Sequence, residues 1–152
     1  MKLPLLLLLI VCAASGQEVI RSIQEVRSLT EGQADAALPV RLEAVATLFN
    51  PQNGDLMIHD GESGMFILNP SLPDDVDVIR PGDRVVVEGV TFFGGYIPSV
   101  EDSAVLSVEP GEIPEPMPIK AEDLFAPDLN LQWVELSAVV VGSEVGETFL
   151  TL

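Results

Sequence analysis

Basic residues are scarce in this 152-residue chain, which has seven lysines and arginines against 24 aspartates and glutamates. The formal net charge is −17, so the surface potential is strongly negative. Because nucleic-acid binding draws its affinity from lysines and arginines that neutralise phosphates, this balance excludes general nucleic-acid binding. It favours solubility and, among ligands, cationic molecules and ions.

Cysteine is nearly absent too, and the single one, Cys12, lies in the apolar stretch 3–14. Lys2 precedes that stretch and the small residues 13–16 follow it, which is the layout of a secretory signal peptide. The apolar run of about 12 residues is shorter than the roughly 20 that a membrane-spanning helix needs. We therefore predict a signal peptide over residues 1–16, cleaved between Gly16 and Gln17, and an exported chain in the periplasm or outside the cell.

That cleavage leaves the mature chain without cysteine, and so without disulfides, a thiolate nucleophile or a cysteine-based metal site. The alternative is a lipoprotein, in which Cys12 becomes the lipidated first residue. Val11 argues against it, because that processing normally has a small side chain before the cysteine.

Histidine occurs once, as His59, directly before Asp60. A catalytic triad also needs a positioned nucleophile, and a metal site needs three or four ligands; no motif of either kind surrounds this pair. Neighbouring residues of a strand point to opposite faces, so the two side chains do not act as one unit. We predict no catalytic residue, no metal site and no cofactor, and we place His59 at the barrel mouth as a candidate ligand contact.

An acidic loop is a candidate calcium site, because Asp74, Asp75 and Asp77 offer closely spaced carboxylates. The glycine and the closing glutamate of an EF-hand loop are missing. A solvated loop is the preferred interpretation.

Two short helical segments are predicted ahead of the first strand. Ser22 and Glu25 have the spacing of a capping box, and Thr30 with Gln33 repeats it. Apolar residues follow Ser22 at helical intervals. The chain then changes to a period of two, typical of a half-buried strand.

Five strands are predicted from this alternation and from the turn signals between the apolar runs. They cover residues 40–48, 56–60, 65–68, 84–90 and 104–108. In the first of them one face is expected to be buried, formed by Val40, Leu42, Ala44, Ala46 and Leu48. Five short strands with tight turns favour a small closed barrel, because closure removes exposed sheet edges.

Aromatic residues make up 5% of the chain, and three of them, Phe92, Phe93 and Tyr96, surround Gly94-Gly95. We predict them in the loop between the fourth and fifth strands, as a candidate stacking platform for a ligand. The negative charge directs that prediction towards sugar, peptide or protein contacts. The alternative is that Phe92 or Phe93 packs in the core.

The pattern restarts after residues 110–118, which are rich in proline and glutamate and are predicted to form an extended linker. Residues 133–139 parallel 39–45, and residues 146–150 parallel 54–58, so the chain contains an internal repeat. Because the pattern stops in mid-strand at Leu152, we predict that residues 119–152 begin an incomplete second module of a longer protein. The alternative is that the last hairpin docks on the first barrel.

The segments 56–60, 64–67 and 80–89 resemble OB-fold proteins, with Gly82-Asp83 at a turn, Val85 and Val87 pointing inward and Gly89 at a bend. With its helical start and the repeat at Trp133, the chain more specifically resembles the exported N-terminal regions of bacterial sensor histidine kinases. The resemblance implies a mainly β chain, with a five-stranded OB-type barrel over residues 17–109 and a partial second copy. No kinase motif is present, so any kinase activity is expected outside this sequence.

The function that this resemblance implies is a non-catalytic binding or sensory module of a larger signal-transduction protein, with an unidentified ligand or protein partner. The alternative is a free-standing exported OB-fold protein that binds small cationic ligands or ions. A hydrolase has no supporting set of residues.

Overall fold

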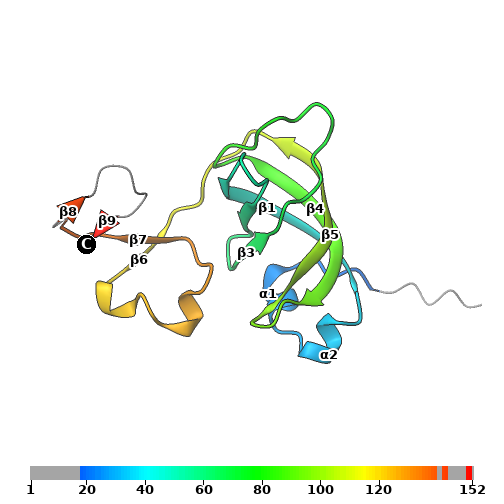
Figure 1. Cartoon of the computed structure of the whole chain (residues 1–152), viewed down its shortest axis with the longest axis horizontal. Helices are drawn as coiled ribbons and strands as arrows, with labels where there is room; N and C mark the ends of the chain where they lie inside the picture. The colour runs from blue at the N-terminus through cyan, green and yellow to red at the C-terminus, as the bar shows by residue number, and fades with distance from the viewer. Residues whose placement is uncertain (1–17, 140–141, 144–149, 152) are drawn as a thin grey trace, which may run out of the picture.

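The main body of the computed structural model is a curled five-stranded antiparallel sheet with two short helices (Figure 1). The structure describes residues 18–139, 142–143 and 150–151, so the predicted signal peptide and its cleavage site lie outside the described residues. Hydrogen-bonded neighbours follow the order β3-β2-β1-β4-β5. The elements of the body are α1 Ile23–Arg27, α2 Glu31–Ala34, β1 Pro39–Phe49, β2 Leu56–His59, β3 Gly64–Ile67, β4 Arg84–Phe93 and β5 Pro98–Glu109. The predicted mainly β fold with a short helical start is confirmed.

The sheet curls until its two outer strands, β3 and β5, approach each other. The Ser99 hydroxyl donates a hydrogen bond to the Phe66 carbonyl across this gap at 3.3 Å. Beyond the end of β3, Ser71 forms a parallel bridge with Ala104 of β5. The result is a partly open five-stranded half-barrel, the form expected of an OB-type module.

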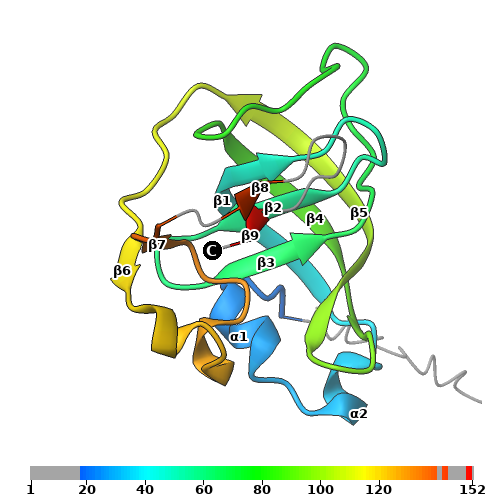
Figure 2. The ribbon, with the colours of Figure 1, turned by 60° about the vertical axis from the view of Figure 1, so that its left-hand side comes forward.

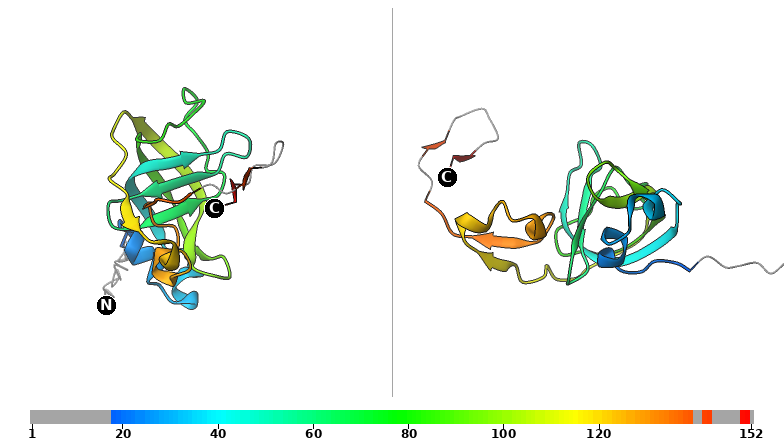
Figure 3. Two further views of the ribbon diagram at one scale, coloured as in Figure 1. Left: turned by 90° about the vertical axis from the view of Figure 1, so that its left-hand side faces the viewer. Right: turned by 90° about the horizontal axis from the view of Figure 1, so that it is seen from below.

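The barrel interior is filled by alternate residues of the strands, together with Ile23 and Val26 of α1, which are fully buried. Figure 3 shows α1 lying at one end of the barrel. The helix thus closes the apolar interior from that end. The strand residues of this core include Val40, Leu42, Ala44, Ala46, Leu56, Ile58, Met65, Ile67, Val85, Val87, Val100 and Val105.

The last two strands of the barrel, β4 and β5, are longer than predicted. β4 continues through Phe93 instead of ending at Val90, and β5 begins at Pro98 instead of Ala104. Their register shifts between Glu88 and Val90, where a β-carbon on Gly89 would lie 2.6 Å from the Val100 side chain. A bulge at glycine bends the pair without ending it, so the polar residues 101–103 continue the strand.

Leu48 was predicted to face the core, and that prediction was wrong. The register between β1 and β2 shifts between Ala46 and Leu48. The extra residue turns Leu48 outward, where it is 47% exposed, and turns Phe49 towards the core. A one-residue shift reverses the faces of every residue beyond it, which explains the error.

The capping box predicted at Ser22 is also absent. The Ser22 side chain makes no capping hydrogen bond, and the first amide of α1, that of Ile23, donates instead to Asp60 Oδ2 at 3.0 Å. Asp60 belongs to the turn between β2 and β3, so the cap comes from 37 residues away. At α2 the predicted pair is present, because Gln33 Oε1 accepts from the Thr30 amide at 2.9 Å.

A smaller unit follows the barrel, made of β6 Met117–Ile119, the 3₁₀ turns Ala121–Asp123 and Pro127–Leu129, and β7 Val134–Leu136. A short pair, β8 Gly142–Ser143 and β9 Leu150–Thr151, comes later. Within the described part of the chain no helix has the length and apolar character needed to cross a membrane.

The small unit and the start of the barrel share one feature, a parallel strand pairing around two short helical segments. Ile20 forms a parallel bridge with Val40, and the two short helices lie between these residues in the sequence. In the same way, Met117 pairs in parallel with Val134, and two helical turns lie between them. Val40 and Val134 are the residues that the predicted sequence repeat aligns. The later half of that repeat, residues 146–150, lies outside the described residues apart from Leu150.

Candidate functional site

His59 ends β2 and is 9% exposed. Its Nδ1 accepts a hydrogen bond from the Gly61 amide at 3.1 Å, and its Nε2 lies 3.3 Å from Gln132 Oε1. An imidazole nitrogen that accepts from an amide carries no proton, so in the neutral ring the proton is on Nε2. Nε2 therefore donates to Gln132, and the histidine connects the barrel to residues far along the chain.

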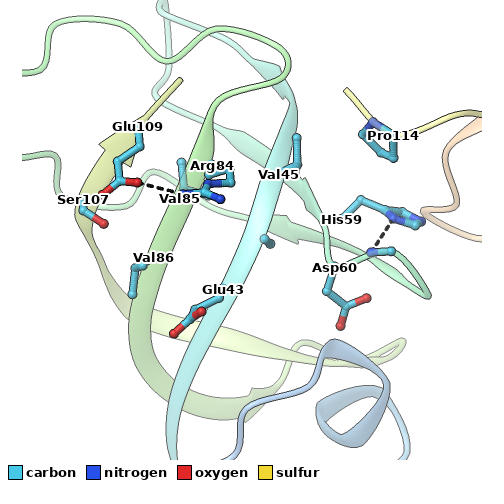
Figure 4. A pocket seen from close by; sticks show the side chains of 12 residues that line it. Glu43, Val45, His59, Asp60, Arg84, Val85, Val86, Ser107, Glu109 and Pro114 are labelled. Carbon is cyan, nitrogen blue, oxygen red and sulfur yellow. Dashed lines mark hydrogen bonds and ion pairs between the residues drawn. The ribbon is translucent and has the colours of Figure 1, made fainter. Parts of the chain in front are cut away.

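A cavity of about 460 Å³ opens beside His59 on the outer face of the sheet (Figure 4). The strand register explains which residues meet there, because His59 pairs with Val45, Val45 with Arg84, and Arg84 with Glu109. This row crosses four adjacent strands. The residues that line the cavity are Glu43, Ala44, Val45, His59, Asp60, Gly61, Arg84, Val85, Val86, Ser107, Glu109 and Pro114.

The charges around the cavity are mainly negative. Three residues with carboxylates, Glu43, Asp60 and Glu109, line the cavity together with one residue with a guanidinium, Arg84. Arg84 is paired with Glu109 at 2.9 Å on an exposed part of the wall. Subtracting the one cation from the three anions leaves a charge of −2 with His59 neutral, so the cavity favours a cation by Coulomb attraction.

Asp60 is occupied by structural hydrogen bonds. Its Oδ2 caps α1, and its Oδ1 accepts from the amides of Glu62 and Ser63 at 3.1 and 2.9 Å. The carboxylate holds the helix and the turn together and contributes its charge to the cavity wall. Glu43 is exposed on the other side of the cavity and is the carboxylate best placed to meet a ligand.

Residues 111–133, here called the strap, lie along the side of the barrel where β2 and β3 are found (Figure 2) and contribute one residue to the cavity. Pro114 of the strap lines the cavity, and its carbonyl accepts a hydrogen bond from Trp133 Nε1 at 3.0 Å. Gln132 contacts His59 as described. The cavity therefore lies where the barrel meets the segment that leads to the smaller unit.

The three aromatic residues that were predicted as a stacking platform lie away from the cavity beside His59. Phe92 and Phe93 are half-buried in the last residues of β4, not in a loop, and Tyr96 is 73% exposed in the turn after them. The Phe93 amide donates to Asp35 after α2. None of the three aromatics lines the cavity at His59, so the structure does not bring the four predicted ligand residues into one site.

Several residues of the site were not found from the sequence. Glu43 and Arg84 are ordinary charged residues on the outward faces of strands, and nothing but the register shows that they meet. Arg27, which does not line the cavity, donates to the Gly64 carbonyl beside His59 at 2.8 Å, and burial lowers the pKa of its guanidinium from the ordinary value. Only the tertiary contacts reveal these roles.

In the described part of the chain no three histidine, cysteine, aspartate or glutamate side chains gather closely enough to hold a metal ion. Comparison with protein families, curated proteins and solved structures finds no match to this chain.

Proposed function

We propose that this chain is a non-catalytic binding module of an exported signal-transduction protein, and that its ligand occupies the cavity beside His59. The observation that carries the proposal is the position of the cavity, which is lined by the barrel and by the strap together. A ligand there contacts the barrel and Pro114 of the strap at once. Occupancy can therefore change how the two units hold each other, as a sensory module requires.

Size and chemistry support a small ligand. A volume of about 460 Å³ is within the range of roughly 300–1,000 Å³ of small-molecule sites. The apolar surface of Val45, Val86 and Pro114 is combined with carboxylates and the histidine. This combination suits an organic cation with a short apolar body.

The second candidate function is a free-standing exported protein that binds small cations or ions. The excess of carboxylates around the cavity favours this ligand class, as does the net charge of −17. The two functions share the site and differ in the consequence of binding. In a free-standing binder the position of the strap does not change when the ligand binds, whereas in a sensory module it does.

Spermidine, choline and L-arginine are the cationic probes that we expect to bind, and citrate and glucose are the anionic and neutral comparisons. Replacement of Glu43 by glutamine is expected to weaken the binding of the best cationic probe about threefold, because one exposed charge contact contributes a fraction of a kcal/mol to about 1 kcal/mol. Isothermal titration calorimetry at low ionic strength measures the affinity.

Glu101→Gln is the matched control, because Glu101 is an exposed residue of β5 that does not line the cavity and the change in net charge is the same. The control is expected to bind like the wild type. Equal weakening by both substitutions would show a general charge effect without a site. Tighter binding of citrate or glucose than of every cation would rule out the cationic ligand class.

A further inference from the structure

The strap is fitted closely to the barrel at its first residue. A β-carbon on Gly111 would lie 2.6 Å from the Gly82 carbonyl oxygen and 2.7 Å from Arg84 Cγ. Only a residue without a side chain passes at this distance. The predicted linker is therefore held against the turn that precedes β4 before it reaches the cavity.

A second close approach lies at the other end of the strap. A β-carbon on Gly64 would lie 1.7 Å from the Leu131 carbonyl oxygen, although Gly64 does not adopt a positive φ. Its small size is needed for space and not for backbone conformation. Gly64 pairs with His59 in the sheet, so the two barrel residues that receive Leu131 and Gln132 lie side by side on β2 and β3.

His59 contacts both the cavity and the strap. It lines the cavity, and its Nε2 proton is directed at Gln132 of the strap. Because Nδ1 is already used by the Gly61 amide, the ring is held in one orientation and one tautomer. The same residue that contacts a ligand in the cavity therefore also fastens the strap.

We propose that the strap is a latched lid of the cavity: Gly64 and His59 form the latch on the barrel, and Leu131 and Gln132 form the part that it holds. Docking places Pro114 over the cavity, and a ligand in the cavity holds the docked strap in place. Docking of the strap and binding of the ligand are thermodynamically linked, so each raises the equilibrium constant of the other by the same factor. The lid role rests on the proposed function, whereas the latch itself does not.

Gly64→Ala and Gln132→Ala are the substitutions that test the latch. Each is expected to raise the population of the undocked strap about fivefold, since the first introduces a clash and the second removes a partly buried hydrogen bond. Trp133 is the only tryptophan, so its emission should shift to the red and its quenching by acrylamide should increase. The lysines are Lys2 and Lys120, so cleavage by lysyl endopeptidase at Lys120 reports local opening of the strap and should accelerate.

Gly32→Ala and Gln52→Ala are the matched controls. Gly32 has no atom within 4 Å of the position that a β-carbon would take, and Gln52 is exposed in the turn between β1 and β2. Both controls should leave Trp133 emission and Lys120 cleavage as in the wild type. Wild-type behaviour of both Gly64→Ala and Gln132→Ala would overturn the latch.

Experiments with spermidine then distinguish the proposed lid role of the strap from the latch that holds it. We expect spermidine to slow Lys120 cleavage in the wild type and to bind Gly64→Ala several-fold more weakly. Binding that leaves the cleavage rate unchanged would overturn the lid and leave the proposed binding function intact. If no cationic probe binds the wild type, the proposed cation binding and the lid both fail, and the cleavage rates of the two variants still decide whether the latch exists.

Discussion

Replacement of Asp60 by alanine is expected to lower the free energy of unfolding by about 3 kcal/mol, because three backbone amides lose a charged acceptor. Two of these amides belong to the turn between β2 and β3. The third, that of Ile23, begins α1, whose Ile23 and Val26 close the barrel interior. The single carboxylate therefore fixes the turn, the helix and the end of the core together.

Thermal and urea unfolding of the Asp60→Ala chain measure this loss, which corresponds to a melting temperature lower by roughly 10 °C. Asp60→Asn keeps one acceptor oxygen and should fall between the wild type and the alanine variant. Asp74→Ala is the control, because Asp74 is exposed in the loop before β4 and its loss changes the net charge equally. If Asp60→Ala unfolds at the same urea concentration as Asp74→Ala, the long-range cap does not stabilise the fold.

The strands themselves were readable from the sequence because their burial has a period of two. Val40, Leu42, Ala44 and Ala46 face the core as the alternation predicts, and each of the five predicted strands overlaps an observed one. The errors lie where the register shifts. Leu48 and the extended ends of β4 and β5 follow bulges, and a bulge leaves no signature in composition or alternation.

The candidate site was predictable only in part. His59 was singled out as a lone histidine on β2, and the structure places it at the cavity. Its partner Gln132 is 73 residues away, and nothing local in the sequence distinguishes that glutamine from any other. Asp60 was predicted as the last residue of the second strand; it lies in the turn after β2, and its role at Ile23 depends on how α1 packs. Contacts between distant segments decide these roles.

Thr91 is the second residue for which a large effect is expected, and its contacts lie at the opposite end of β4 from Arg84. Its side chain is 1% exposed. The hydroxyl donates to the Ala34 carbonyl at 2.7 Å and accepts from the Leu38 amide at 3.0 Å. One hydroxyl therefore ties the end of α2 and the residue before β1 to β4.

Thr91→Val is expected to lower the free energy of unfolding by about 3 kcal/mol, although valine has nearly the same shape. The Leu38 amide loses its acceptor in a partly buried place, whereas the Ala34 carbonyl keeps a longer contact with the Ala37 amide at 3.3 Å. An unsatisfied buried polar group costs about 1–3 kcal/mol, so the amide accounts for most of the loss. Amide hydrogen exchange at Leu38 should accelerate as well.

Thr91→Ser separates the hydroxyl from the shape of the side chain. It keeps both hydrogen bonds and removes one buried methyl group, for which about 1 kcal/mol is expected. Urea unfolding should therefore place serine between the wild type and valine. The reverse order, with valine the more stable, would mean that packing and not the hydroxyl holds α2 and β1 against β4, and Leu38 exchange would then stay slow in Thr91→Val.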